Sequence, residues 1–216
     1  ATGQASGLLT FAGRGLSPRA IVASLTGSGS IDTGAIRFSS LTPATIRAAA
    51  NDVLKADAEL MFERLQETLK SQSGANAMTM TPRRIAVEFA DGLLKLAPVT
   101  IESADGKIAA DAHLDLQSLR VPSTWRIEPT AKIEGRSGKA ADPLPAVTLA
   151  YAGPVAALGR IEPRITSDAL ARELSVRRIE RDVEELERLR RLDEERARDD
   201  AERRRAEDAA RKAAEE

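Results

Sequence analysis

Apolar and polar residues alternate with a period of two across the middle of the chain, from Ile85 to Leu116. Asp-Gly interrupts the alternation twice, at Asp91-Gly92 and at Asp105-Gly106. Strict alternation is typical of strands with one buried face. Asp-Gly favours the type I′ hairpin turn, because both central residues of that turn need positive φ. The pattern therefore predicts an antiparallel meander with one apolar face and one polar face.

The two faces of this meander can be assigned residue by residue, because shifting a strand by one position would invert the whole set. The apolar face is predicted to hold the large aliphatic and aromatic side chains, namely Ile85, Val87, Phe89, Leu94, Leu96, Ile108, Leu114 and Leu116. The polar face is predicted to hold Glu88, Lys95, Lys107, Asp111, His113 and Asp115. How the molecule works then depends on what covers the apolar face.

A helical segment is expected before the meander, at about residues 43–70. Thr42 is a good N-cap, and Pro43 suits the first helical position. The apolar residues that follow are spaced roughly three and four apart, which predicts an amphipathic helix or two helices joined near Asp57. Inserted within a β meander, this segment is expected to pack across one end or one face of the sheet.

Two flanking segments are predicted to extend the sheet. Residues 27–30 (Gly-Ser-Gly-Ser) lie inside a strand-like stretch and are interpreted as a bulge or turn in a strand. A phosphate-binding loop is rejected there, because no Lys follows and no βα unit surrounds it. After the meander, residues 125–133 indicate one more strand, in which Pro129 points to an edge or a bulge. Val147–Tyr151 indicates a further strand.

The composition changes near residue 165, so we expect an α+β chain with a sheet domain over residues 1–165 and a long charged helix over residues 166–216. Within that helix, apolar residues step three, four and three along a short coiled-coil seam. These candidate oligomer or partner contacts are Val176, Ile179, Val183 and Leu186. No large apolar residue follows Leu192. A solvated charged helix, a dimerising coiled coil and a partner-binding helix all fit this pattern.

The composition leaves little for catalysis. The chain has no Cys, so disulfides, thiolate metal sites and Cys nucleophiles are excluded. His113 is its one His, and no nucleophile motif accompanies the imidazole. We expect no enzymatic activity, no cofactor and no metal. A net charge of −1 and 3 % aromatic residues offer neither a basic surface nor stacking platforms for nucleic acid. The chain starts at Ala1 without Met, and we interpret it as an internal fragment.

Several of these pieces occur together in a recognisable order. They are a Leu-x-Gly-x-Gly strand, an inserted helical stretch, strands joined at Asp-Gly, and a closing apolar strand that ends in Gly-Pro before a charged helix. Here they are Leu25–Gly29, the helix after Thr42, Asp91-Gly92, Gly106–Leu119, and Val147–Tyr151 with Gly153-Pro154. In this order they resemble the C-terminal region of AsmA-type proteins, over roughly Gly7 to Leu192.

The resemblance implies a periplasmic protein anchored in the inner membrane, involved in outer-membrane biogenesis and phospholipid transport, whose curved sheet forms a groove for lipid acyl chains. The eight apolar-face residues above are then the candidate groove lining. The alternative is a structural or interaction module in which the helical insertion fills the concave face and the tail mediates oligomerisation or partner binding. Burial of Ile46, Val53, Leu60 and Leu65 against Ile85, Phe89, Leu94 and Ile108 would favour this alternative, whereas an open strand face would favour the groove.

Overall fold

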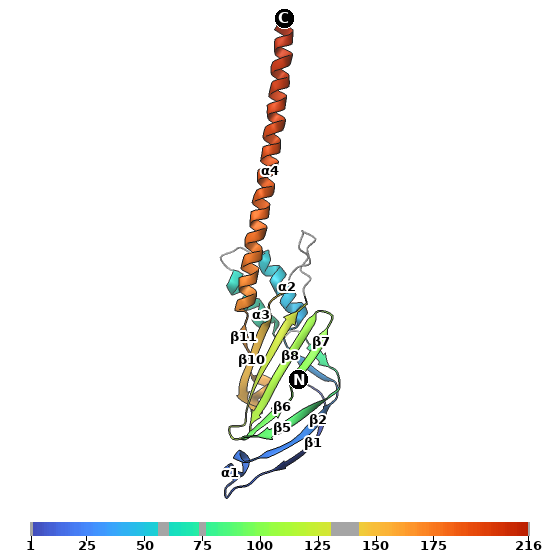
Figure 1. Cartoon of the computed structure of the whole chain (residues 1–216), viewed down its shortest axis with the longest axis vertical. Helices are drawn as coiled ribbons and strands as arrows, with labels where there is room; N and C mark the ends of the chain where they lie inside the picture. Colours follow the sequence, from blue (N-terminus) through green and yellow to red (C-terminus); the bar gives the residue numbers. More distant parts are fainter. Residues whose placement is uncertain (1, 56–60, 74–76, 131–142, 216) are drawn as a thin grey trace. The chain divides into compact units, whose positions relative to one another are not determined.

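The computed structural model describes residues 2–55, 61–73, 77–130 and 143–215 (Figure 1). Its fold class is α+β, as expected: an open, curved antiparallel sheet, two short helices packed on it, and a long C-terminal helix. The chain divides into two compact units, Ala1–Glu173 and Leu174–Glu216, and each is described by itself.

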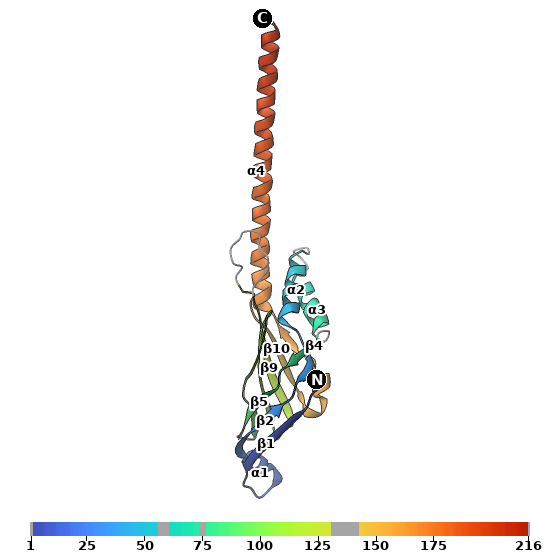
Figure 2. The ribbon, with the colours of Figure 1, turned by 90° about the vertical axis from the view of Figure 1, so that its right-hand side faces the viewer.

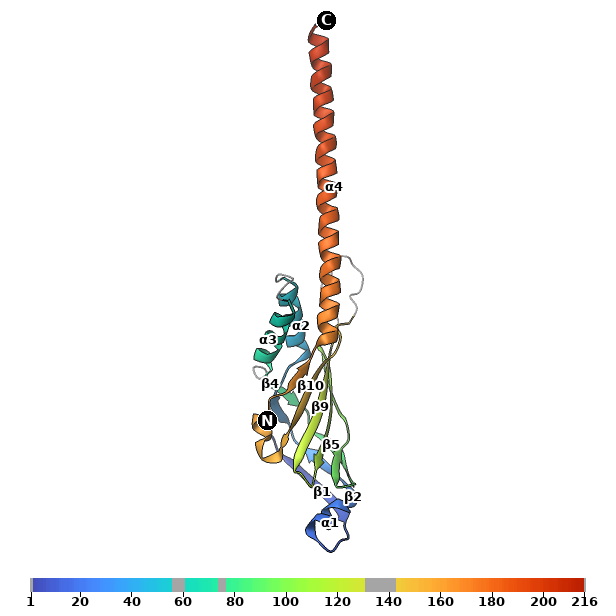
Figure 3. The same ribbon diagram turned by 90° about the vertical axis from the view of Figure 1, so that its left-hand side faces the viewer.

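The main sheet of the first unit is built from antiparallel neighbours throughout. Its strands lie in the order β1 (Ala5–Ala12), β2 (Thr26–Thr33), β5 (Arg83–Ala90), β6 (Leu93–Leu96), β8 (Gly106–Asp115), β9 (Arg120–Pro129), β10 (Val147–Pro154) and β11 (Arg164–Thr166), with β7 (Val99–Ser103) also paired to β8. A separate two-stranded ribbon joins β3 (Ile36–Ser39) to β4 (Ala77–Met80). Figures 2 and 3 show this ribbon together with helices α2 (Pro43–Leu54) and α3 (Met61–Gln72) on one side of the main sheet.

The strand register confirms the predicted assignment of the two faces. Leu94 lies opposite Phe89 on one side and Leu114 on the other, so the apolar residues of neighbouring strands point the same way. Lys95 lies opposite His113 on the polar face. Ion pairs join direct cross-strand neighbours on that face, with 2.7 Å between Arg84 Nε and Asp32 Oδ1. Leu116 follows the last residue of β8 and is half-buried.

Only one of the two Asp-Gly turns has the expected geometry. Asp91 (φ 55°) and Gly92 (φ 74°) form the type I′ turn between β5 and β6. At the second Asp-Gly the prediction is wrong, because Ser103 pairs with Gly106 and the turn therefore centres on Ala104 and Asp105. Gly106 instead opens strand β8 with φ 146°.

The helical insertion forms two helices, α2 (Pro43–Leu54) and α3 (Met61–Gln72), and their junction lies outside the described residues. Thr42 caps α2 as expected, in a reciprocal hydrogen-bonded arrangement with Thr45. Arg47 Nη2 donates to Asp105 Oδ1 at 2.6 Å, which ties α2 to the β7–β8 turn. Helix α2 packs against β8 and β9, and α3 packs against β11.

The glycines of β2 lie in a regular strand. The pairing of β2 with β1 runs without a break from Thr26 to Thr33, and its pairing with β5 runs from Gly27 to Thr33. The predicted strand is therefore confirmed, and the predicted bulge or turn within it is wrong. Gly27 lies between Phe11 and Phe89, whose ring centroids are 5.4 Å apart. The missing side chain lets two aromatic rings on non-adjacent strands meet across the glycine.

Strand β9 corrects a second expectation. It lies inside the sheet between β8 and β10, not at an edge. Pro122 also lies in this strand and has no N–H to donate. The pairing of β9 with β8 leaves out Val121 and Pro122, so the proline costs no hydrogen bond there. The strand ends at Pro129, and residues 131–133 of the expected strand lie outside the described residues.

Two further short helices, at residues 18–23 and 155–160, were not expected from the sequence. Helix α1 (Pro18–Ala23) begins at Ser17, whose hydroxyl accepts a hydrogen bond from Ala20 N at 3.2 Å, and the 3₁₀ helix η2 (Val155–Arg160) follows β10. The Ser17-Pro18 pair carries the same start signal as Thr42-Pro43.

The C-terminal helix α4 (Asp168–Glu215) lies within the range expected for the charged helix, residues 166–216. Leu170 and Ala171 in its first turn are buried, which explains why the first unit continues to Glu173. The second unit is a charged helix with ion pairs three or four residues apart, such as Arg188 with Glu185 at 2.6 Å. Within the described ranges, no helix is both long and apolar enough to cross a bilayer.

Candidate functional site

One end of the apolar sheet face is sealed by the inserted helices. Ile108, Ile127, Val147 and Leu149 are fully buried, and α2 packs on the two strands that carry the first pair. From the helices, Ile46 and Leu65 are fully buried and Val53 nearly so, in helices that pack on each other and on β8, β9 and β11, while Leu60 lies outside the described residues. This end is therefore ordinary protein core, and Ile108 belongs to that core.

The middle of the apolar face carries a cluster of three half-buried aromatic side chains. Phe38 of β3 meets Trp125 of β9 edge to face, with ring centroids 5.1 Å apart, and Trp125 meets Tyr151 of β10 at 6.0 Å. Burial raises the pKa of Tyr151, so its phenol stays neutral across the physiological range. Phe38 thus joins the β3–β4 ribbon to β9 of the main sheet through a ring contact, and none of the three rings carries a charge.

The other end of the same face remains accessible. Five of the eight candidate lining residues are half-buried, namely Ile85, Leu94, Leu96, Leu114 and Leu116, whereas Val87 and Phe89 are buried. The apolar surface continues onto β1, where Phe11 is 58 % exposed and Leu9 is 36 % exposed. The face therefore changes from closed core beneath α2 to a more accessible apolar lining on β1, β6 and the end of β8, with Val87 and Phe89 of β5 buried beside it.

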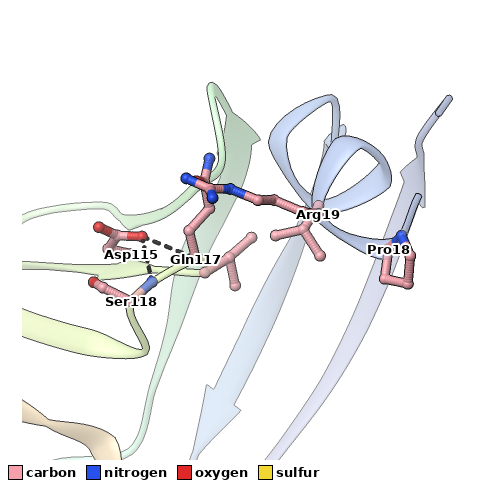
Figure 4. A pocket seen from close by; sticks show the side chains of 7 residues that line it. Pro18, Arg19, Asp115, Gln117 and Ser118 are labelled. Atoms are coloured by element: carbon pink, nitrogen blue, oxygen red, sulfur yellow. Dashed lines mark hydrogen bonds between the residues drawn. The ribbon is translucent and has the colours of Figure 1, made fainter. Parts of the chain in front are cut away.

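A shallow pocket lies beside the open end, between α1 and the turn that joins β8 to β9 (Figure 4). It is lined by Pro18, Arg19, Val22, Asp115, Leu116, Gln117 and Ser118. Asp115 Oδ1 accepts hydrogen bonds from Ser118 N at 3.0 Å and Gln117 N at 2.8 Å. These bonds, that of Ser118 first, lower the pKa of Asp115, so its carboxylate stays ionised and holds the turn.

The polar face holds the histidine and several ion pairs. His113 lies across from Lys95, flanked on its own strand by Asp111 and Asp115. In the part of the chain that the structure describes, no cluster of three or more His, Asp or Glu side chains could hold a metal ion. The polar face instead carries structural ion pairs, such as Lys107 Nζ with Glu128 Oε2 at 3.0 Å.

The candidate helix seam belongs to the second unit. Val176, Ile179, Val183 and Leu186 are between 48 % and 66 % exposed. Large apolar side chains on one stripe of a solvated helix are the usual mark of an interaction surface.

No protein-family model, no curated protein and no solved structure matches this chain.

The sequence prediction missed three residues of the candidate site. Leu9 and Phe11 extend the open lining, and Phe38 belongs to the aromatic cluster in the middle of the face. A signal for Leu9 and Phe11 exists, because they alternate with Leu8 and Thr10 and lie across from the two β2 glycines. Phe38 carries no such signal, because its partner Trp125 is far away in the sequence.

Proposed function

We propose that the open end of the apolar face binds lipid acyl chains, in a periplasmic envelope protein of the AsmA type. The observation that carries the proposal is the change in burial along one continuous apolar face. Ile108 is fully buried beneath α2, whereas Leu94 and Leu114, paired with each other on the same face, remain half-exposed.

Acyl chains suit this lining for physical reasons. They need no directional hydrogen-bond partners, and each buried methylene contributes about 0.8 kcal/mol. The half-buried lining residues are Leu and Ile, which make an apolar wall without a fixed polar anchor. A large uncovered apolar patch is otherwise unfavourable in water, so an occupant of this kind would stabilise the exposed end.

The resemblance to AsmA-type proteins supports the same proposal. The chain combines three features on which the resemblance rests: an antiparallel sheet, an inserted helical segment and strands joined at Asp-Gly. We extend the proposal to the role that the resemblance implies: phospholipid transport in outer-membrane biogenesis, by a protein held at the inner membrane. The inserted helices contribute by closing one end of the face, so that acyl chains are held between β1 and the aromatic cluster of Phe38, Trp125 and Tyr151.

Site-specific photocrosslinking tests the proposal. A photoactivatable amino acid is placed at Leu94 or at Leu114, and the purified chain is irradiated with vesicles of dioleoyl phosphatidylethanolamine and phosphatidylglycerol. Lipid adducts measured by intact-protein mass spectrometry are expected from these two positions, because both face the open lining.

The matched controls are Lys95 and His113, which lie one residue away on the same two strands and face the polar side. Ile108 is the control for buried core. Leu114→Asp places a carboxylate in the acyl path and is expected to lower lipid capture at least about tenfold, equivalent to about 1.4 kcal/mol. Equal adducts from both faces, or none from Leu94 and Leu114, would exclude the groove.

A further inference from the structure

The exposed stripe on α4 has a definite charge pattern at its borders. With Val176 taken as heptad position a, the stripe occupies a and d, and Glu180 and Glu187 occupy successive e positions. Asp182 occupies the g position on the other border. Between Val176 and Glu187 the residues at the e and g borders are therefore all acidic, and the next g position, Leu189, is apolar and 46 % exposed.

This pattern opposes pairing with a second copy of the chain in either orientation. In a parallel dimer, Asp182 would face Glu187 of the second copy, since g positions lie opposite the next e positions. In an antiparallel dimer centred on the stripe, Glu180 would face Glu180 and Asp182 would face Asp182. Every such contact sets like charges against each other, and none sets opposite charges together.

The residues beyond the stripe oppose a longer parallel dimer as well. The next a and d positions are Arg190 and Asp193, and each would face its own copy across the seam. Neighbouring arginines pair with the border acids only loosely, with 3.8 Å between Arg178 and Asp182 and 3.7 Å between Arg191 and Glu187. These arginines lie at b and c positions, away from the seam, so they leave the acidic borders facing outward.

We propose that residues 176–187 bind an amphipathic helix from a different protein, one that carries Lys or Arg beside an apolar stripe of two heptads. The apolar residues of the two helices would bury each other, and basic e and g side chains would pair with Glu180, Asp182 and Glu187. The contact covers about twelve residues, so it spans about 18 Å of helix. The proposal uses the second unit only, so it and the acyl-binding proposal can fail separately.

The test measures binding of synthetic helices to the whole purified chain by fluorescence anisotropy. One three-heptad peptide has Leu at a and d with Lys at e and g, and a second is identical except for Glu at e and g. Each peptide repels itself, so self-pairing does not compete. The Lys peptide is expected to bind at least about tenfold tighter than the Glu peptide, equivalent to about 1.4 kcal/mol.

A charge-reversed chain makes the test specific to the borders. Glu180→Lys with Glu187→Lys is expected to reverse the preference, so that the Glu peptide binds tighter. The matched control, Glu184→Lys with Glu195→Lys, changes the net charge equally at b and f positions and is expected to keep the original preference. Ile179→Asp is expected to abolish binding of either peptide.

Three results would overturn the proposal: equal binding of the two peptides, binding of neither, or a stripe-dependent dimer of the unmodified chain in sedimentation equilibrium. A reversal produced equally by the Glu184 and Glu195 changes would also overturn it, because net charge alone would then explain the preference.

Discussion

Replacing Gly106 by Ala is expected to destabilise the first unit strongly, because this glycine lies where α2 meets the sheet. Gly106 has φ 146°, a conformation that side-chain-bearing residues rarely adopt. A Cβ atom at this position would lie 2.8 Å from Pro43 Cβ, in the first turn of α2, and 2.9 Å from Pro129 Cα. The substitution therefore strains the backbone and also pushes α2 away from β9.

The two effects can be given magnitudes. Backbone strain of this kind costs about 1–3 kcal/mol. Overpacking a closely packed contact costs about 1–3 kcal/mol more. A domain of this size loses about 2–4 °C in Tm per kcal/mol, so the expected decrease is about 5–20 °C.

Thermal unfolding followed by circular dichroism measures the change, with Gly159→Ala as the control. Gly159 lies in η2, and a Cβ built there meets nothing within 4 Å. That substitution is expected to leave the Tm unchanged or to raise it slightly, because Ala restricts the unfolded chain. If Gly106→Ala unfolds at the same temperature as Gly159→Ala, the positive φ of Gly106 and its close contacts with Glu128 O, Pro43 and Pro129 are together contradicted.

Three further outcomes are expected. A double-mutant cycle of Phe11→Ala and Phe89→Ala, measured by chemical denaturation, should give a coupling energy of about 0.5–1.5 kcal/mol from their ring contact, and strict additivity would contradict it. Arg126, and after it Lys107, hold the pKa of Glu128 below its ordinary value of 4.5. The ionised Glu128 therefore stabilises the fold above pH 4.5, and this stabilisation is lost as the pH falls through the lowered pKa. Glu128→Gln should therefore lower the Tm at neutral pH and have no effect once Glu128 is protonated; an effect independent of pH would show that charge is not involved. Deleting residues 197–216 should move the Tm of the first unit by no more than about 2 °C, since residues 197–206 are exposed, and a larger decrease would show that the tail packs.

The sequence predicts the meander well because its information is local. Alternation from Ile85 to Leu114 assigns each side chain to its face, and a type I′ turn at Asp91-Gly92 fixes the register of β5 with β6. The second Asp-Gly shows where local information ends. Asp105 is held by Arg47, 58 positions away, and Gly106 is required by the approach of Pro43, so contacts from α2 decide the turn there.

The candidate site is only partly predictable for the same reason. Alternation places Ile108 and Leu114 on one face, but it does not distinguish the end covered by α2 from the open end. That distinction depends on where a helix inserted some 60 residues earlier comes to rest. The position of β9 inside the sheet, with Pro122 in an unpaired stretch, likewise depends on strands that follow it in the sequence.

The insertion between β2 and β5 also has a consequence for the order of folding. Strands β5 to β9 follow one another through short connections, so their pairing needs little loop closure. The hydrogen bond between Thr33 and Arg83 joins residues 50 positions apart, and forming it requires β3, α2, α3 and β4 to be gathered into the intervening loop. The meander is thus the natural folding nucleus, and β1 and β2 join it late. Strand β1, whose Leu9 and Phe11 extend the open apolar lining, is therefore expected to be among the last strands added to the sheet and, on local opening, among the first to leave it.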